Sequence, residues 1–253
     1  MNILLVNDDG VMAPGINALK NYLYNRGHNI YVVAPESHQS AKSQAITLGD
    51  PLRLHKHIID DFVCYGVTGF PADCVFMGVL EIYKDIKFDL IVSGINNGAN
   101  VGFDINYSGT VGAAREALSY GIPCIASSLF THDLQADFTF ACEMTELVIN
   151  KLSENGFRKD CIYNLNVPYV PAEEIKGFAI TNMSGVRYFS GIEKHTDPYG
   201  KDYYFITGKM NDWDYVSGTD ADYLFRNYVN LTPIDIDYTH KEEYNRLQEI
   251  FKN

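Results

Sequence analysis

The chain begins with MNILLVNDDGVMAPG at residues 1–15, and this stretch decides the fold class. Its apolar run, Ile3–Val6, is typical of a buried strand and stops at two adjacent carboxylates, Asp8 and Asp9, followed by Gly10. Open α/β sheets bind their ligands at the carboxyl ends of strands. Adjacent carboxylates repel each other unless a partner offsets the charge, and a hard cation such as Mg²⁺ or Mn²⁺ is the usual partner. Because Asp-Gly is also a common turn dipeptide, a metal site and a plain turn are equally open here.

The composition describes a folded, acidic protein. Its 253 residues fit one large α/β domain or a domain with an extension, and hydrophobic residues make up 46% of them. The formal net charge of −12 argues against a broad basic surface for duplex nucleic acid. An anionic substrate would therefore require local cations, backbone N–H groups or a metal ion.

Neither a targeting segment nor a membrane partner is expected. The N-terminal apolar run is too short for a signal sequence, and no stretch approaches the ~20 apolar residues of a membrane span. The five cysteines lie in apolar contexts without a CxxC pattern: Cys64, Cys74, Cys124, Cys142 and Cys161. This usage predicts reduced, mostly buried thiols in a cytoplasmic protein. His55 and His57 form an HxH pattern, which favours alternate polar side chains on one strand face over a zinc site.

Apolar strands alternate with amphipathic helices along most of the chain. Strands are expected at 3–6, 30–34, 88–93, 122–127 and 162–167, with extended structure near 46–67. Helices are expected near 16–25, 71–83, 111–117 and 136–152. The segment 94–102 is too rich in Gly and Asn to be regular and is expected to be a loop. This β-α-β-α rhythm predicts an α/β fold with a doubly wound, mostly parallel sheet and helices on both faces.

The rhythm changes after Thr181. Residues 184–217 are rich in Gly, Tyr, Asp and Lys, which indicates hairpins or long loops. A strand is expected at 227–234 and a terminal helix at 240–252, and Trp213 is expected at an interface or in a hairpin. The sequence thus divides into a core, 1–182, and a C-terminal extension, 183–253.

Four polar loops follow predicted strands, at 7–10, around Ser40, at 93–100 and at 107–110. Parallel strands bring such loops to one edge of the sheet. Two carboxylates, a hydroxyl and an amide oxygen would form an all-oxygen site suited to Mg²⁺ or Mn²⁺. The Ser108-Gly109-Thr110 turn opens a helix, whose free N–H groups favour phosphate. A phosphate ester is therefore the expected substrate.

Six motifs in these stretches together resemble the SurE family of survival-protein nucleotidases. They are NDDGxxAPG at 7–15, APExxxS at 34–40, TGFPADCV at 68–75, SGINxGxN at 93–100, YSGTVxAAxEA at 107–117 and NxNVP at 164–168. The resemblance implies a Rossmann-like core and a metal-dependent phosphatase of nucleoside 5′- and 3′-monophosphates. It also implies C-terminal elements exchanged between the subunits of a homodimer or homotetramer.

The resemblance also assigns residues to roles. The implied ligands of one divalent metal ion, Mg²⁺ or Mn²⁺, are Asp8, Asp9, Ser40 and Asn96. Asp8 and Asp9 are the implied catalytic residues, because the metal would orient a water whose proton one carboxylate accepts. The implied phosphate and substrate contacts are Asn100, Ser108, Gly109 and Thr110.

The sequence departs from the family pattern on either side of Ser40. An Arg commonly precedes that Ser and a Gly follows it, whereas this chain has Gln39 and Ala41. Because Ala adopts positive φ less readily than Gly, the substitution bears on the path of the loop. Lys42 or His38 would have to supply the phosphate contact that the Arg makes.

Two other classes of protein also carry acidic residues after a first strand. A haloacid-dehalogenase-type phosphatase uses an aspartyl nucleophile and requires Asp-x-Asp after its first strand, but here the two acids are adjacent. A phospho-accepting receiver switch, which is not an enzyme of this kind, requires a further Asp after strand three and a Lys after strand five. The matching loops here carry Gly94, Asn96, Ser127 and Ser128 instead.

Overall fold

The structure is a computed structural model that describes residues 1–133, 135–187, 191–208 and 216–252. Within these residues, nine strands form one sheet in the order β3-β4-β2-β1-β5-β6-β7-β11-β8, and β9 and β10 pair separately. The strands are β1 (Asn2–Val6), β2 (Asn29–Pro35), β3 (Leu54–Ile59), β4 (Phe62–Val67), β5 (Leu90–Asn97), β6 (Cys124–Phe130), β7 (Cys161–Pro168), β8 (Gly177–Ile180), β9 (Gly191–Thr196), β10 (Asp202–Thr207) and β11 (Tyr228–Asp235).

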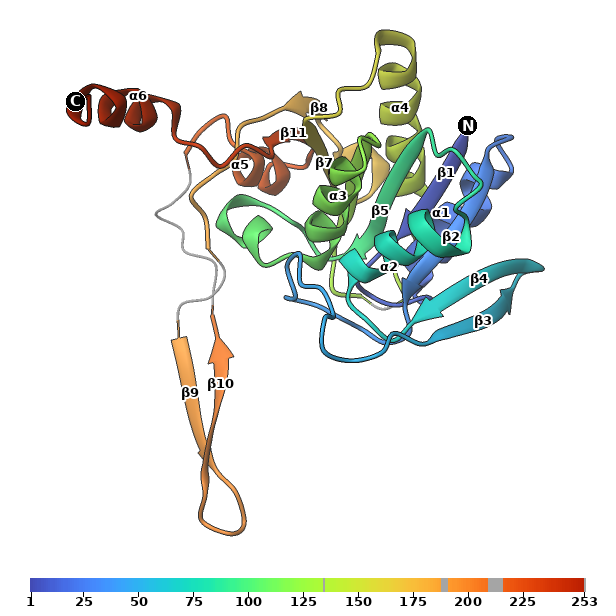
Figure 1. Ribbon diagram of the computed structural model, residues 1–253, viewed down its shortest axis with the longest axis horizontal. Helices are drawn as coiled ribbons and strands as arrows, with labels where there is room; N and C mark the ends of the chain where they lie inside the picture. Colours follow the sequence, from blue (N-terminus) through green and yellow to red (C-terminus); the bar gives the residue numbers. More distant parts are fainter. Residues whose placement is uncertain (134, 188–190, 209–215, 253) are drawn as a thin grey trace.

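The helices connect these strands across both faces of the sheet (Figure 1). The α-helices are α1 (Pro14–Tyr24), α2 (Pro71–Met77), α3 (Gly109–Ser119), α4 (Thr139–Asn155), α5 (Asp220–Phe225) and α6 (Lys241–Ile250). Shorter helical turns are η1 (Gly78–Ile82), which continues α2, η2 (Gly102–Asn106) and η3 (Ala172–Glu174). In the described part of the chain, no helix is both long enough and apolar enough to span a bilayer.

The first strand supplies both hydrophobic cores. On β1, Ile3 and Leu5 pack with α1 and α4 on one face, whereas Leu4 and Val6 pack with α2 and α3 on the other. All four side chains are fully buried. Successive strand residues point to opposite faces, so a continuous apolar run is what a sheet covered on both sides requires. The predicted doubly wound, mostly parallel α/β/α fold is confirmed.

Strand β5 ends later in the structure than the sequence predicts. A loop was expected from Gly94 onward, but β5 continues to Asn97, with a shift of its register against β6 between Ser93 and Asn96. Gly94 has a φ of 135°, and a Cβ there would lie 2.2 Å from the carbonyl oxygen of Ser127. Glycine therefore permits a distortion within the strand, where sequence reasoning expected it to end the strand.

Other differences are smaller. The expected extended region near 46–67 is a β3–β4 hairpin over 54–67, and its first part is not a strand. Strand β8 and helix α5 were not expected, because both are short and their sequences lack a clear period. The other predicted helices and strands are present, with ends that differ by a few residues.

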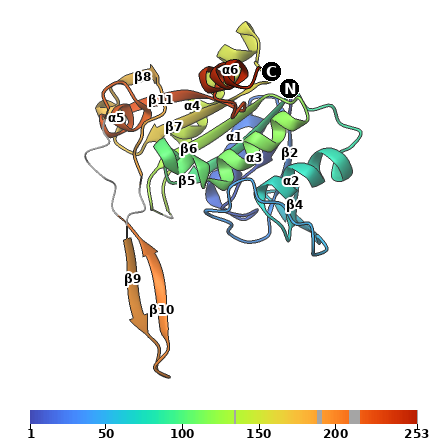
Figure 2. The same cartoon turned by 60° about the vertical axis from the view of Figure 1, so that its left-hand side comes forward.

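The C-terminal segment contributes to the core and also projects from it. Strand β11 lies in the main sheet, antiparallel to β7 and parallel to β8. The predicted hairpin is present as β9–β10 and extends away from the body in both views (Figures 1 and 2). Helix α6 has no buried residue. Trp213, expected at an interface or in a hairpin, lies outside the described residues.

Candidate active site

The predicted loops meet around one cavity at the carboxyl edge of the parallel strands. The cavity has a volume of about 420 Å³, and five of the predicted site residues line it: Asp8, Ser40, Asn96, Asn100 and Ser108. They come from the loops after β1 and β2, from β5 and the loop that follows it, and from the N-terminus of α3. Strand order thus brings together side chains that are far apart in sequence, as expected for an open α/β sheet.

Asp8 is the most constrained of these residues. It is 3% exposed, and its Oδ1 accepts a hydrogen bond of 2.6 Å from the Oγ1 of Thr110. A Cβ on Gly109 would lie 2.9 Å from Asp8 Oδ2, so only glycine leaves room for this carboxylate. Burial, the largest cause, raises the pKa of Asp8 to about 6; the hydrogen bond from Thr110 opposes this rise and the charge of Asp9 adds to it.

Asp9 faces a second cavity of about 300 Å³, which shares Asn97 and His132 with the first. Its Oδ2 accepts a hydrogen bond of 3.1 Å from the N–H of Asn97, and its Oδ1 lies 3.3 Å from the Nδ1 of His38. Burial raises the pKa of Asp9, and the contacts with Asn97 and His38 oppose that rise. The two carboxylates therefore face adjoining spaces.

The Ser40 loop holds Ala41 in a conformation that glycine favours, and the family pattern has a Gly at this position. Ala41 has a φ of 58°, the left-handed conformation that glycine favours; the strain for a non-glycine residue is about 1 kcal/mol. The N–H of Gln39 donates to the carbonyl oxygen of Asp8 at 2.7 Å, and the N–H of Ser43 donates to that of Tyr107 at 2.9 Å. These bonds at both ends of the loop fix the exposed Ser40 at the cavity.

The two residues expected to replace the family's Arg lie in different places. His38 contacts Asp9 and lines the second cavity. Lys42 is exposed, and it is not among the residues that line the first cavity.

The loop after β5 is fixed by the NxNVP motif. Asn100 is buried, and its carbonyl oxygen accepts hydrogen bonds from the side chains of Asn164 and Asn166, at 2.8 and 3.0 Å. The Oδ1 of Asn166 accepts from the N–H of Asn100 at 2.8 Å, and the side chain of Asn100 donates to Ser128. The side-chain nitrogen of Asn96 donates to the carbonyl of Gly98 at 2.7 Å, and this bond sets the orientation of its amide oxygen. The motif on β7 therefore braces the loop that carries Asn100.

The predicted residues at the N-terminus of α3 have two different structural roles. Ser108 is the N-cap, accepts a hydrogen bond from the N–H of Val111, and lines the cavity. Gly109 and Thr110 are buried behind it and contact Asp8, and they are not among the lining residues. Asn100 and Ser108 thus line the cavity wall, while Gly109 and Thr110 support the carboxylate.

Sequence reasoning missed several residues that line the cavities: Asn97, Tyr107, Phe130 and His132. Asn97 and Tyr107 stand inside the SGINxGxN and YSGTVxAAxEA motifs, so their neighbours pointed to them. Phe130 ends β6 and His132 follows it, and only the parallel order of β5 and β6 brings them to the site.

Both histidines of the HxH pattern contact one carboxylate. His57 Nε2 lies 3.0 Å from one oxygen of Glu36, and His55 Nδ1 lies 3.3 Å from the other, which confirms that both histidines share a strand face. Gly66 on β4 makes this possible, because a Cβ there would lie 1.8 Å from Glu36. Among the residues that the structure describes, no group of three or more His, Cys, Asp or Glu side chains is placed to hold a metal ion.

The donor chemistry of the Asp8 cavity fits a hard cation. Its donors are mainly carboxylate, hydroxyl and amide oxygens, which suit Mg²⁺ and Mn²⁺, and His132 adds one imidazole. The raised pKa of the buried Asp8 marks an uncompensated negative charge that a cation would offset.

Known proteins resemble the chain over its full length. The family model described as Survival protein SurE matches residues 3–190. The chain is 41% identical to the 5′-nucleotidase SurE of Heliobacterium modesticaldum over 252 residues, which cover 99% of this chain and 90% of that protein. It is 44% identical to the 5′-nucleotidase SurE of Fervidobacterium nodosum over 259 residues, covering 99% and 97%. The fold matches the crystal structure of the SurE protein from Aquifex aeolicus with a TM-score of 0.85, at 37% identity and 100% coverage of both chains.

Proposed function

The chain belongs to the SurE family, and from this premise we propose that it is a metal-dependent 5′-nucleotidase, a phosphoric monoester hydrolase that releases phosphate from nucleoside monophosphates. The observation that carries the proposal is the cavity where five predicted site residues from separate segments of the chain meet: Asp8, Ser40, Asn96, Asn100 and Ser108. Neither an aspartyl-nucleophile phosphatase nor a receiver switch is favoured, because the family match is to neither class. We extend the proposal to 3′-monophosphates on the resemblance alone.

We propose that Asp8, Asp9, Ser40 and Asn96 hold one divalent ion, Mg²⁺ or Mn²⁺. When bound, the ion supplies Lewis acidity to the phosphoryl oxygens and lowers the pKa of a water molecule. The chain's own residues fix the geometry: Thr110 holds Asp8 Oδ1, and the N–H of Asn97 holds Asp9 Oδ2. One of the two carboxylates accepts the proton of the attacking water.

The substrate phosphate is proposed to bind at the wall formed by Asn100 and Ser108, beside the N-terminus of α3. The positive end of this 11-residue helix favours an anion there. Gly109 and Thr110 would act indirectly, because the hydroxyl of Thr110 donates to Asp8. This division of roles refines the four phosphate contacts that the sequence predicts.

The nucleoside is proposed to occupy the apolar part of the same cavity. Val101, Tyr107 and Phe130 line it together with the phosphate wall, and its volume lies within the usual range for small-molecule sites. Aromatic side chains offer faces on which a base can stack.

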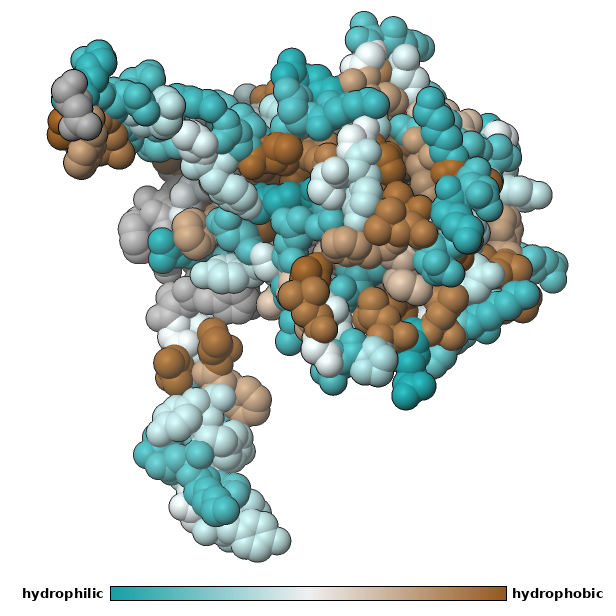
Figure 3. Space-filling model, viewed as in Figure 1, coloured by the Kyte–Doolittle hydropathy of each residue, from teal (hydrophilic) through white to brown (hydrophobic). Residues whose placement is uncertain are grey.

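A homodimer or homotetramer is proposed from the C-terminal projection. Hydrophobic side chains gather on the hairpin near the body (Figure 3); among them, Ile192 is 73% exposed and Ile206 is 75% exposed. Helix α6 ends in exposed Ile250 and Phe251. Exposed apolar surface of this kind is typical of interaction sites. Light scattering should give a multiple of the 28.5 kDa chain mass, and Ile192→Asp with Ile206→Asp should reduce it; an unchanged mass would count against the hairpin.

We place the enzyme in the cytoplasm because its five cysteines are free thiols. Four of them are buried in the cores, where they behave as small apolar residues. The acidic surface gives no reason to propose duplex nucleic acid or a membrane as a partner.

The proposed activity is tested by phosphate release from a panel of nucleoside 5′- and 3′-monophosphates. The protein is first treated with a chelator, and Mg²⁺ or Mn²⁺ is then added back. We expect no release before the metal is restored and release from at least one monophosphate afterwards. Turnover that is indifferent to metal, or no turnover of any monophosphate, would contradict the proposal.

A further inference from the structure

The loop that carries Asp8 and Asp9 is held at both of its ends. At its start, the Asn7 side chain donates to the carbonyl of Gly10 at 2.9 Å and accepts from the N–H of Gly10 at 3.1 Å. At its exit, the side-chain Nδ2 of Asn17, on α1, donates to the carbonyls of Val11 and Ala13 at 3.1 and 2.9 Å. The first clamp lies within the NDDG motif, whereas the second comes from a helix residue outside every motif.

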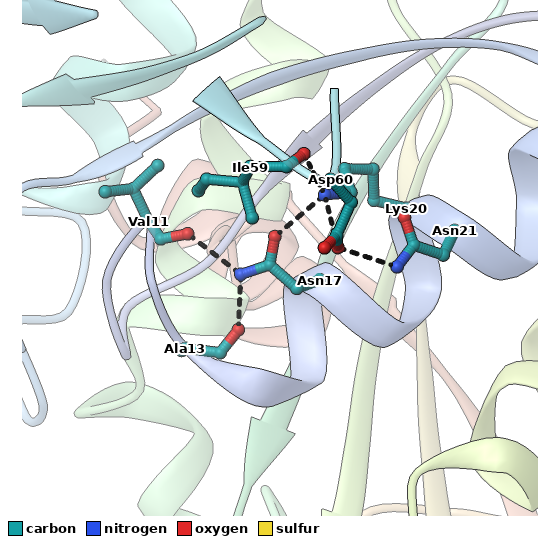
Figure 4. Close-up of polar contacts among 7 residues, drawn as sticks. All are labelled: Val11, Ala13, Asn17, Lys20, Asn21, Ile59 and Asp60. Atoms are coloured by element: carbon teal, nitrogen blue, oxygen red, sulfur yellow. Dashed lines mark hydrogen bonds and ion pairs between the residues drawn. The ribbon is translucent and has the colours of Figure 1, made fainter. Parts of the chain in front are cut away.

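Lys20 orients the amide of Asn17. The Nζ of Lys20 donates to Asn17 Oδ1 at 3.2 Å, so the oxygen of the amide faces the ammonium and its nitrogen faces the two carbonyls (Figure 4). An ammonium group is only a donor, and a flipped amide would place an oxygen against two carbonyl oxygens. The cation therefore selects the orientation that holds the loop.

The position of Lys20 is itself fixed by the β3–β4 turn. Its side chain is fully buried, and its Nζ also donates to the carbonyl of Ile59 at 2.9 Å and to Asp60 Oδ2 at 3.3 Å. Asp60 and Asp61 both have positive φ, as two-residue hairpin turns require. A buried ammonium persists only when its donors are satisfied, and here three acceptors surround it (Figure 4).

Helix α1 also contacts the end of β5, which carries Asn96. A Cβ on Gly15 would lie 2.0 Å from the carbonyl oxygen of Ile95, the residue before Asn96. The first turn of α1 is therefore in close contact with the strand end that carries Asn96. Asn17 and Lys20 line neither cavity, so any effect on the site must pass through the backbone that they hold.

We propose that Asn17 is a positioning residue for the Asp8–Asp9 loop and that buried Lys20 orients it, so that the β3–β4 turn helps to set the affinity of the site for its metal. The inference rests on the proposed roles of Asp8 and Asp9. Replacing the donors of Asn17 leaves the carbonyls of Val11 and Ala13 without that clamp, and the loop loses preorganisation for the cation.

The test is Mn²⁺ binding, measured from the electron paramagnetic resonance signal of free Mn²⁺ after chelation of the protein. Asn17→Asp keeps the size of the side chain and an acceptor for Lys20 but removes both donors. We expect its Kd for Mn²⁺ to rise about tenfold, and its activity to need proportionately more Mn²⁺ for half-saturation. A purely structural loss would lower activity equally at every Mn²⁺ concentration.

The matched control is Asn21→Ala. Asn21 lies on the same helix and donates to the same Asp60 Oδ2 at 3.0 Å, so its loss perturbs the helix-to-turn contact and leaves the donors of Asn17 in place. We expect its Kd to stay within about twofold of the wild type. An equal rise in both variants would overturn the proposal, as would an unchanged Kd in Asn17→Asp.

Lys20→Met keeps the test decisive if Asn17→Asp does not fold. Met fills the buried volume without an ammonium, so the Asn17 amide loses the donor that orients it, as do the acceptors of the β3–β4 turn, while the donors of Asn17 itself stay in place. We expect the Kd to rise about threefold, and an unchanged Kd would overturn the proposal. Wild-type protein that binds no Mn²⁺ would overturn the metal site itself, whereas wild-type binding with unaffected variants would overturn only the role of Asn17 and Lys20.

Discussion

The sheet core and the C-terminal projection treat the same residue type in opposite ways. Ile3 and Ile125 in the sheet are fully buried, whereas Ile192 and Ile206 in the β9–β10 hairpin are 73% and 75% exposed. The core therefore buries its apolar side chains within one chain, whereas the hairpin exposes them to solvent (Figure 3). We propose that catalysis depends on the first region and subunit association on the second.

The largest effect is expected from a substitution of Asp8 in the core. Asp8→Asn removes a carboxylate that we propose as a metal ligand, so we expect kcat to fall by at least about 10³-fold, or about 4 kcal/mol in activation free energy. Phosphate release under saturating metal measures the effect, and circular dichroism checks the fold. Asp85→Asn is the matched control, because Asp85 is exposed and lies in none of the site loops. Near-normal turnover in Asp8→Asn would remove Asp8 from the mechanism.

Matched isoleucines test the difference in burial. Ile125→Ala opens a cavity in the central strand β6 and should lower the free energy of unfolding by about 2–5 kcal/mol. Ile192→Ala should lower it by less than about 0.5 kcal/mol, apart from any dependence on protein concentration. Urea unfolding at several protein concentrations measures both values. Equal losses at the two positions would mean that the hairpin is part of the cooperative core.

Buried and exposed carboxylates should also differ in their effect on stability without metal. The folded protein holds the proton of Asp8 more tightly than the unfolded chain, so stability is lost as pH rises from 3.8 toward about 6. At ~1.4 kcal/mol per pKa unit, Asp8→Asn should stabilise the metal-free protein by about 3 kcal/mol at pH 8 and by about 1 kcal/mol at pH 4.5.

Asp202→Asn provides the comparison for that stability experiment. Asp202 is 42% exposed in the hairpin, where it pairs with Lys194 at 2.7 Å. Its replacement should change the free energy of unfolding by less than about 1 kcal/mol at pH 8. Urea unfolding in the presence of a chelator measures both variants. No gain in Asp8→Asn would show that burial of Asp8 carries no cost.

The smallest expected effect concerns the substrate cavity. Tyr107→Ala should raise the KM for a nucleoside monophosphate about tenfold and change kcat by less than about threefold, because a stacking contact mainly supports binding. Tyr199→Ala is the control, since Tyr199 is 89% exposed near the hairpin turn. Steady-state kinetics separate the two constants. A fall in kcat without a change in KM would place Tyr107 in the chemistry and not in nucleoside binding.

Local sequence was sufficient for most of the fold. The run Ile3–Val6 and its counterparts predicted the parallel strands, because a sheet covered on both faces requires apolar side chains on both sides. Errors arose where tertiary contacts override local signals. The sequence around Gly94 is typical of a loop. In the structure the carbonyl oxygen of Ser127 lies so close to Gly94 that this position inside β5 requires glycine. Ala41 adopts positive φ because hydrogen bonds at both ends of its loop hold it there.

The sequence predicted which residues belong to the candidate site but not how they are arranged. The motifs named Asp8, Asp9, Ser40 and Asn96 as ligands, and these roles stay predictions. No motif predicted that the hydroxyl of Thr110 donates to Asp8, or that Asn164 and Asn166 brace the loop at Asn100. Such contacts join residues up to 102 positions apart, and no local pattern encodes them.

By itself, the sequence determined the α/β class, the family and the loops that carry chemistry, because strand periodicity and short motifs are local properties of the chain. Tertiary structure decided which of those residues share a cavity and which ones stand behind them. It also decided that Lys20 is buried against a turn 40 residues away. The physical reason is that burial and hydrogen-bond partnership depend on how distant segments pack, whereas the apolar pattern depends only on neighbours.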